Sequence, residues 1–268
     1  KWLSFGKLRM SYAQAGSDLN PYETSMVFGI GTVYSGTTPA NTLYVPDNLN
    51  NPAIQPSFAH AYEAGADFRF FDNRLGVDFT YYVQRNENQI IQLDVSGSNG
   101  YSSVTINAGL IQNKGFEVAL TGSPIRRDKI SWDATLNLSR NRSTVVELYP
   151  GVNVYGYGST TFSSVPTYLN SYVGKPFGSL IGQAYQRDPA TGMILLDENN
   201  LPLYTDATHD FGSVVPDMTG GLQNTLRFGK FDVGAMMDFQ IGGKFFSRTK
   251  MILVRVGVDP VTTAMNDR

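Results

Sequence analysis

Two neighbouring stretches of this chain alternate apolar and polar residues over an unusual length. In residues 62–70 every second residue is apolar, and after a short turn at Asp72-Asn73 the alternation resumes in residues 75–83. Because successive side chains of a strand point to opposite faces, each stretch predicts a strand with one apolar and one hydrated face. Each arm has about ten residues, the length of a tilted membrane-spanning strand, whereas soluble strands usually have ~5–6. The pattern therefore predicts a hairpin from the wall of a membrane β-barrel.

Five further stretches show the same alternation. They are residues 8–14, 116–121, 130–139, 221–228 and 231–241. Their apolar sides carry no charge, and Asn224 is the one strongly polar exception. A charge on the lipid face at mid-bilayer costs about 2–4 kcal/mol, so a barrel wall requires such a face. A soluble two-sheet sandwich also keeps its inner face uncharged, so this observation leaves both folds open.

The lengths of the connections distinguish these two folds. Short connections at Asp72-Asn73, residues 124–129 and Gly229-Lys230 alternate with long ones at residues 16–59, 86–112 and 141–217. Soluble domains rarely contain structureless loops beyond ~12–15 residues, whereas outer-membrane barrels combine short periplasmic turns with long extracellular loops. We therefore predict an all-β chain in which residues 1–268 form an antiparallel transmembrane β-barrel segment of about seven long strands. Because bacterial barrels close with an even number of strands, we expect this segment to be part of a larger barrel.

Composition excludes several other classes of protein. The net charge is −2, which gives no basic footprint for nucleic acid, and the absence of cysteine excludes disulfides and thiolate metal sites. No stretch offers ~18 consecutive apolar residues, so we predict no transmembrane helix. The 15 Tyr, 16 Phe and 27 Gly suit strands, turns and interfacial aromatic belts, for which Tyr81, Trp132 and Phe231 are candidates.

Polar residues on the hydrated side of the strands are candidates for a lining that faces the lumen or a plug. They are Glu63, Asp67, Arg69, Asp78, Glu117, Asp133, Asp232 and Asp238. Aromatic residues in the long connections are candidates for contact with a ligand or a partner protein, because a ring with a polar tip can stack while it stays hydrated. They are Tyr34, Tyr44, Tyr155, Tyr157, Phe162, Tyr168 and Tyr172. Packing of these rings into an ordered loop cap is an equally good interpretation.

The sequence offers no set of catalytic or metal-binding residues. His60 and His209 are far apart and lack nearby ligands, and the acidic run at residues 197–200 is followed by Leu201-Pro202, without the glycine of an EF-hand loop. We therefore expect a protein that is not an enzyme and has no cofactor.

Several motifs carry a resemblance to a known family. Residues 8–16 read LRMSYAQAG, close to an LRxSYGxxG strand, and residues 62–82 fit the hairpin pattern EAGxDxxxFxNRLxxxxxYY. Residues 107–117 fit NaGxxxNkGxE, Ser131-Trp132 and residues 137–139 fit the following strand, and residues 215–243 fit PdxxGG…QxGG. Together these motifs resemble the SusC/RagA-like TonB-linked outer-membrane transporters of Bacteroidetes.

That resemblance implies a location in the outer membrane and active import of a nutrient, either an oligosaccharide or an oligopeptide. It implies three partners: membrane lipid, a SusD-like surface lipoprotein that acts as a lid, and TonB, which would act through a plug region. We expect the plug, the signal peptide and the final strands of the barrel to lie outside these residues. Two alternatives remain open: a soluble or surface β-rich module that binds carbohydrate or acts as an adhesin, and a passive porin.

Overall fold

The computed structural model describes residues 2–19, 21–162, 165–206 and 208–263, and within these the side chains of residues 160–162, 165 and 263 are not described. The chain divides into two compact units. The first unit comprises Lys1–Tyr155, Ser171–Phe177 and Asp217–Ile241, and the second comprises Gly156–Asn170, Gly178–Pro216 and Gly242–Arg268.

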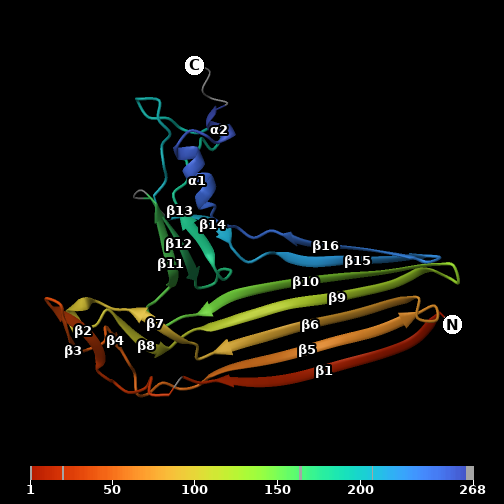
Figure 1. Cartoon of the computed structure of the whole chain (residues 1–268), viewed down its shortest axis with the longest axis horizontal. Helices are drawn as coiled ribbons and strands as arrows, with labels where there is room; N and C mark the ends of the chain where they lie inside the picture. Colours follow the sequence, from red (N-terminus) through yellow and green to blue (C-terminus); the bar gives the residue numbers. More distant parts are fainter. Residues whose placement is uncertain (1, 20, 163–164, 207, 264–268) are drawn as a thin grey trace. The chain divides into compact units, whose positions relative to one another are not determined.

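A seven-stranded antiparallel sheet dominates the first unit (Figure 1). Its order is β1-β5-β6-β9-β10-β15-β16. The strands are β1 (Leu3–Ser17), β5 (Ser57–Phe70), β6 (Leu75–Glu87), β9 (Leu110–Arg127), β10 (Ile130–Glu147), β15 (Met218–Phe228) and β16 (Phe231–Ile241). The prediction of seven long strands is confirmed. Strands β9 and β10 reach 18 residues each, which is longer than the alternation predicted.

Among the described residues of the first unit, no second layer covers either face of this sheet. In the part of the chain that the structure describes, the buried hydrophobic residues are Ala108, Val145 and Ile181, whereas Leu8 is 78% exposed and Met10 is 89% exposed. An apolar face that packs on nothing is not the inner face of a sandwich. Strands β1 and β16 remain as edges among the described residues, so the sheet does not close on itself within this chain.

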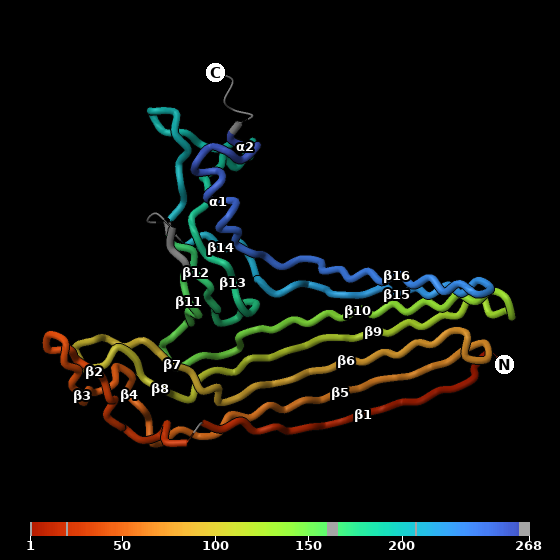
Figure 2. The backbone as a smooth tube through the Cα atoms, viewed as in Figure 1, coloured from red at the N-terminus to blue at the C-terminus, as the bar shows by residue number. Residues whose placement is uncertain are grey.

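The tight turns of the three hairpins lie at one end of the sheet, as Figure 2 shows. Phe71, Asp72 and Asn73 turn with φ of 53°, 55° and 63°, a region that Asp and Asn tolerate better than most residues. The predicted connection over residues 124–129 is wrong in extent, because β9 continues to Arg127. Pro124 lies in a β-bulge of β9 opposite Asp133. Proline has no N–H to donate to the neighbouring strand, so the bulge is a position that tolerates it.

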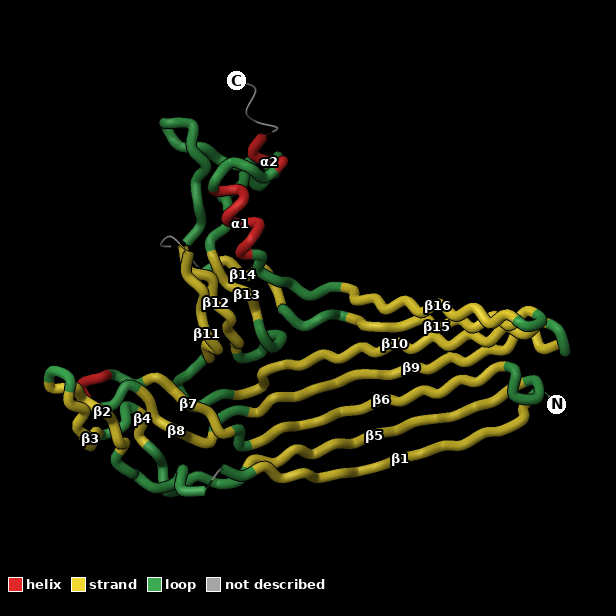
Figure 3. The backbone as a smooth tube through the Cα atoms, viewed as in Figure 1, coloured by secondary structure: helices red, strands yellow, loops and turns green. Residues whose placement is uncertain are grey.

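The long connections carry secondary structure of their own, which the sequence did not reveal (Figure 3). The first unit contains the hairpin of β2 (Gly29–Ser35) and β3 (Thr38–Tyr44). It also contains a small sheet in which β8 (Ser103–Asn107) pairs with β7 (Ile90–Asp94) and with β4 (Asn48–Leu49). The described residues of the long connections therefore form strands of their own.

The second unit is built on a four-stranded sheet with two short helices. The strands are β11 (Val154–Phe162), β12 (Val165–Tyr172), β13 (Ser179–Gly182) and β14 (His209–Ser213), and the helices are α1 (Arg248–Arg255) and α2 (Pro260–Thr263). Ser247 caps α1, since its side chain accepts a hydrogen bond from the backbone N–H of Lys250. Among the described residues no helix has both the length and the apolar character needed to cross a bilayer.

Candidate functional site

The strand register places all eight predicted polar residues on one face of the seven-stranded sheet. One row across the sheet runs through Lys7, Asp67 and Asp78, which pair in register, and continues to Gly221 and Asp238. The apolar rows occupy the opposite face, since Phe68 pairs with Val77 and Leu136 pairs with Leu222. The sheet therefore has one hydrated and one apolar side, as the alternation predicts.

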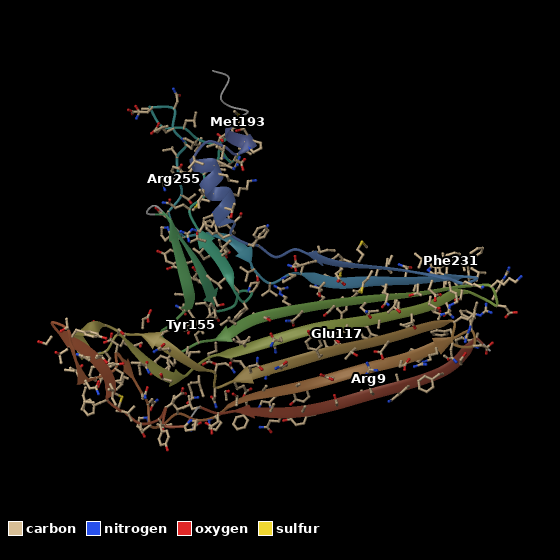
Figure 4. The ribbon with its side chains drawn as sticks, in the orientation of Figure 1. Arg9, Glu117, Tyr155, Met193, Phe231 and Arg255 are labelled. Carbon is tan, nitrogen blue, oxygen red and sulfur yellow. The ribbon has the colours of Figure 1, made fainter. Side chains whose placement is uncertain are left out.

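Arg9, which is labelled in Figure 4, makes a polar contact through two nitrogens on the hydrated face. Its guanidinium donates from two nitrogens to the carboxylate of Asp78, with Nη1 2.9 Å from Oδ2, and also donates to the hydroxyl of Thr80. Gly65 on the intervening strand β5 pairs in register with Arg9 on β1 and with Thr80 on β6. A Cβ at Gly65 would stand 2.6 Å from Nε of Arg9, so the absence of a side chain opens the path from β1 to β6.

The other predicted polar residues have lesser partners. Asp67 lies 3.7 Å from Arg69, whose guanidinium also covers the ring of Phe5 at 5.7 Å. The remaining contacts are Ser11 to Glu63 at 3.3 Å, Ser123 to Asp133 at 2.5 Å and Arg227 to Asp232 at 2.7 Å. The pair Asp67 and Arg69 lies within β5, whereas the other contacts join neighbouring strands and so help to hold the sheet together.

An open hollow of about 790 Å³ lies over the middle of this face. Its polar lining comes from Arg9, Asp78, Thr80, Glu117, Asn137, Ser139, Thr219, Asp238 and Gln240. Glu117 on β9 and Asp238 on β16 are exposed, whereas Asp78 is paired with Arg9. The hollow is therefore a hydrated, acidic surface that can hold water, cations or polar groups.

The predicted aromatic residues are divided between the two units. Tyr34 and Tyr44 belong to the exposed β2–β3 hairpin of the first unit. Tyr157 on β11 and Tyr168 on β12 belong to the second unit. Tyr155, the second residue of β11, and Tyr172, the last residue of β12, belong to the first unit, and the ammonium of Lys175 lies 5.0 Å from the ring of Tyr172. The side chain of Phe162 lies outside the described residues.

The second unit contains an aromatic cleft of about 910 Å³ that sequence reasoning missed. Tyr185 and Tyr204 pack with ring centroids 5.2 Å apart, and His209 meets Phe211 edge-on at 4.8 Å. The remaining large or charged residues of the lining are Arg187, Lys244, Phe245, Phe246 and Met251. Partial burial raises the pKa of Tyr204, and the neighbouring Tyr185 raises it further. Rings together with cations suit contacts with planar, polar solutes.

The cleft was missed because its walls come from segments that are far apart in sequence. A backbone ladder brings Tyr185 opposite Tyr204, and Lys244 joins through a hydrogen bond from its N–H to the carbonyl of Ser213. The pair Phe245-Phe246, which follows the final alternating stretch, is the one local signal that could have drawn attention to this region.

Neither the histidines nor the acidic run forms a reactive centre in the part of the chain that the structure describes. His60 bonds to the hydroxyl of Tyr12 at 3.0 Å, and His209 packs on Phe211. Asp197 accepts the backbone N–H groups of Asn199 and Leu201, so the acidic run is a capped turn. No group of three or more metal-ligating side chains occurs among the described residues.

Comparison with known proteins identifies the family of the chain. The family described as TonB dependent receptor-like, β-barrel, matches residues 1–258. The chain belongs to the TonB-dependent receptor β-barrel family. Proteins of this family are transporters and not enzymes, and their barrels are outer-membrane proteins. The resemblance to the SusC/RagA-like transporters is thereby confirmed.

Individual members of the family match either most of the chain or a shorter part of it. TonB-dependent receptor P3 of Formosa agariphila is 25% identical over 272 residues, which cover 92% of this chain and 26% of that protein. TonB-dependent receptor SusC of Bacteroides thetaiotaomicron is 25% identical over 91 residues, 34% of this chain and 9% of that protein. Where the match is long, the chain spans about a quarter of its relative.

Solved structures share the fold. The RagAB peptide transporter superposes with a TM-score of 0.68 at 21% identity, covering 91% of this chain and 27% of that chain. The RagAB peptide importer in an open-open state gives 0.66 at 20% identity. At this identity the likeness establishes the fold alone.

Proposed function

We propose that this chain is part of the barrel wall of an outer-membrane protein that imports a nutrient oligomer. The observation that carries the proposal is the pair of uncovered sheet faces, one apolar with Leu8 and Met10 exposed, the other polar around Arg9 and Asp78. Lipid on the first face and water on the second give each side chain a suitable solvent. The tight turns would face the periplasm and the folded connections the outside.

The transport mechanism that fits this wall is active import. TonB would supply the energy through a plug that fills the lumen, and the polar face, including Glu117 and Asp238, would line the solute path or contact that plug. Family membership and the fold shared with RagAB, named as a peptide transporter, support this mechanism. In this mechanism the solute is moved without any change to its covalent bonds.

The folded connections are the candidate surfaces for solute and for a SusD-like lipoprotein partner. The cleft lined by Tyr185, Tyr204 and Phe246 has the volume of a small-molecule site, and its rings and cations suit an oligopeptide or an oligosaccharide. Because the structure with the shared fold is described as the RagAB peptide transporter, an oligopeptide is the first solute to test.

Uptake by cells that make the complete protein tests the proposal. We expect accumulation of a labelled oligopeptide mixture or oligosaccharide mixture to saturate with concentration and to stop when the proton gradient is collapsed. A passive porin would continue to equilibrate the solute after the gradient is lost. A soluble module would appear outside the membrane fraction, and that result would refute the assignment to a membrane wall.

A further inference from the structure

The apolar face of the sheet becomes cationic at its loop end. Strands β6, β9 and β10 extend beyond the alternating stretches recognised in the sequence. Four cations occupy these extensions on the apolar face: Arg85, Lys114, Arg140 and Arg142. The register is continuous here, because Tyr81 pairs with Phe116, which pairs with Arg140, and the next row joins Val83, Lys114 and Arg142. The cations therefore point to the same side as the apolar band.

These four side chains have no counter-charge in the described part of the protein. All four are exposed, and none of their charged groups makes a hydrogen bond or an ion pair with a described residue. Lys114 lies directly opposite Arg142, an arrangement of like charges that destabilises a sheet. The carboxylates at this end of the sheet are Glu87, beyond Arg85 on β6 and paired with Phe58, and Glu147 on β10, paired with Leu110. An external anion would relieve the repulsion.

The position of the cluster corresponds to the headgroup level of a membrane. Tyr62, Tyr81 and Phe116 lie on the same face, immediately before the cations, where an aromatic belt would meet the interface. At a rise of ~3.4 Å per residue and a tilt of ~40°, the segment of β10 from Trp132 to Arg142 covers a height of about 25 Å. That is the height of the apolar band of an outer-membrane barrel.

We propose that Arg85, Lys114, Arg140 and Arg142 bind the phosphate groups of a lipid in the leaflet at the loop end of the barrel. The inference rests on the membrane location proposed above. Guanidinium forks match phosphate oxygens in pairs, and cations on neighbouring strands can reach one headgroup together. The apolar band directly below them would receive the acyl chains of the same molecule. Phosphate and hydrocarbon are thus recognised on one continuous surface.

Native mass spectrometry of the complete protein in a neutral detergent tests this site, with diphosphorylated lipid A as the added lipid. The test variant carries Lys114→Gln, Arg140→Gln and Arg142→Gln. A matched control removes three cations from the turn end through Arg126→Gln, Arg127→Gln and Lys129→Gln. We expect the dissociation constant for the first bound lipid to rise roughly tenfold or more in the test variant and less than about twofold in the control.

Equal affinity for the test variant and the native protein, or an equal loss in the control, would overturn the proposal. If the triple variant does not fold, as judged by heat-dependent migration on a gel, Arg142→Gln alone replaces it. This single change should weaken binding about threefold, whereas Arg142→Lys should largely keep it. A protein that stays soluble without detergent would refute the membrane location itself. That result is distinct from a loss of lipid affinity, because it is obtained without adding lipid.

Discussion

Arg9 on β1 reaches Asp78 on β6 across an entire intervening strand. The two side chains meet in a paired contact, with Nη1 of Arg9 2.9 Å from Oδ2 of Asp78, and both are 40% exposed. The contact exists because Gly65 of β5, the register partner of Arg9, leaves room for the guanidinium. Arg9, Gly65 and Asp78 thus tie three strands together on the hydrated face. The contact also neutralises one charge of the directly opposed pair Asp67 and Asp78.

The first prediction concerns the space above Gly65. In the complete protein refolded in detergent, Gly65→Ala should lower the urea concentration at the midpoint of unfolding, because the new methyl displaces the guanidinium from Asp78 and stands 3.0 Å from the carbonyl oxygen of Phe79. Gly234→Ala on β16 is the control, since a Cβ there meets only a backbone oxygen at 4.0 Å. Urea titration measures both variants. A Gly65→Ala protein as stable as the control variant would show that the paired contact contributes nothing.

The second prediction concerns Gly115, where the neighbours cannot move aside. A Cβ there would stand 2.5 Å from the hydroxyl of Tyr82 and would also overlap the backbone carbonyl of Arg140 on the next strand. Gly115→Ala should cost about 2 kcal/mol or more, because the backbone of β10 must shift. Removing the ring with Tyr82→Ala should not rescue this variant. If it does, the ring and not the backbone is the obstacle.

The third prediction concerns the polar exception on the apolar face. The indole Nε1 of Trp132 donates to Oδ1 of Asn224 at 3.2 Å, so the amide placed among apolar residues is not left without a partner. Trp132→Phe should destabilise the complete protein in detergent by about 1–3 kcal/mol, beyond the loss of ring contacts, because the amide of Asn224 is orphaned. Combining it with Asn224→Leu should recover part of that loss. A double-mutant cycle of unfolding free energies without coupling would contradict this account.

Much of the sheet follows from the sequence, for a physical reason. A period of two separates the faces of every strand, and Phe68, Val77, Leu136 and Phe239 all lie on the face that the alternation predicts. The strand ends do not follow, because Arg85, Lys114, Arg140 and Arg142 replace apolar residues and so end the pattern while the backbone ladder continues. Backbone hydrogen bonds do not depend on which side chains are present, so the amino-acid sequence does not show where they end.

The candidate site is less accessible to sequence reasoning. The polar residues were predictable as a set, but the span from Arg9 to Asp78 depends on the pairing of three strands and on Gly65. The aromatic cleft depends on Tyr185 meeting Tyr204 and on Phe246, which enters from a distant segment. A periodic pattern in the sequence cannot predict these contacts, because they depend on how segments that are distant in sequence are brought together.

The fourth prediction concerns two capped turns in the second unit. Asp188 accepts the backbone N–H groups of Ala190 and Thr191, both at 2.8 Å, and these bonds, that of Thr191 first, hold the pKa of Asp188 below its usual value. Asp188→Ala should speed hydrogen exchange of these two amides several-fold. Asp197→Ala should instead speed exchange at Asn199 and Leu201. Faster exchange in both turns from either change would mean that they open as one unit.

The depressed pKa also fixes the pH range over which Asp188 stabilises its turn. The folded state favours the ionised carboxylate, so the stabilisation is fully present above the ordinary Asp pKa and disappears as the pH falls through the lower, folded value. We expect pepsin to cut the native protein within residues 188–192 only well below a pH of about 3.8. The Asp188→Ala protein should be cut there at higher pH as well, and equal cleavage of the two proteins at every pH would contradict the role of the carboxylate.

The last prediction concerns charge in the hollow of the hydrated face, and it rests on the proposed transport function. Arg9 compensates Asp78, whereas Glu117 and Asp238 are exposed acids on the same lining. Carboxylates in a water-filled path concentrate cations and repel anions. Glu117→Gln with Asp238→Asn should therefore lower the uptake of a cationic oligopeptide severalfold relative to an anionic one of equal length, with less effect at high salt because of screening. Glu87→Gln, on the opposite face, removes one charge and is the control for Glu117→Gln alone, and it should leave the ratio unchanged. If both variants shift the ratio equally, the acids act through overall charge and the hollow is not on the solute path.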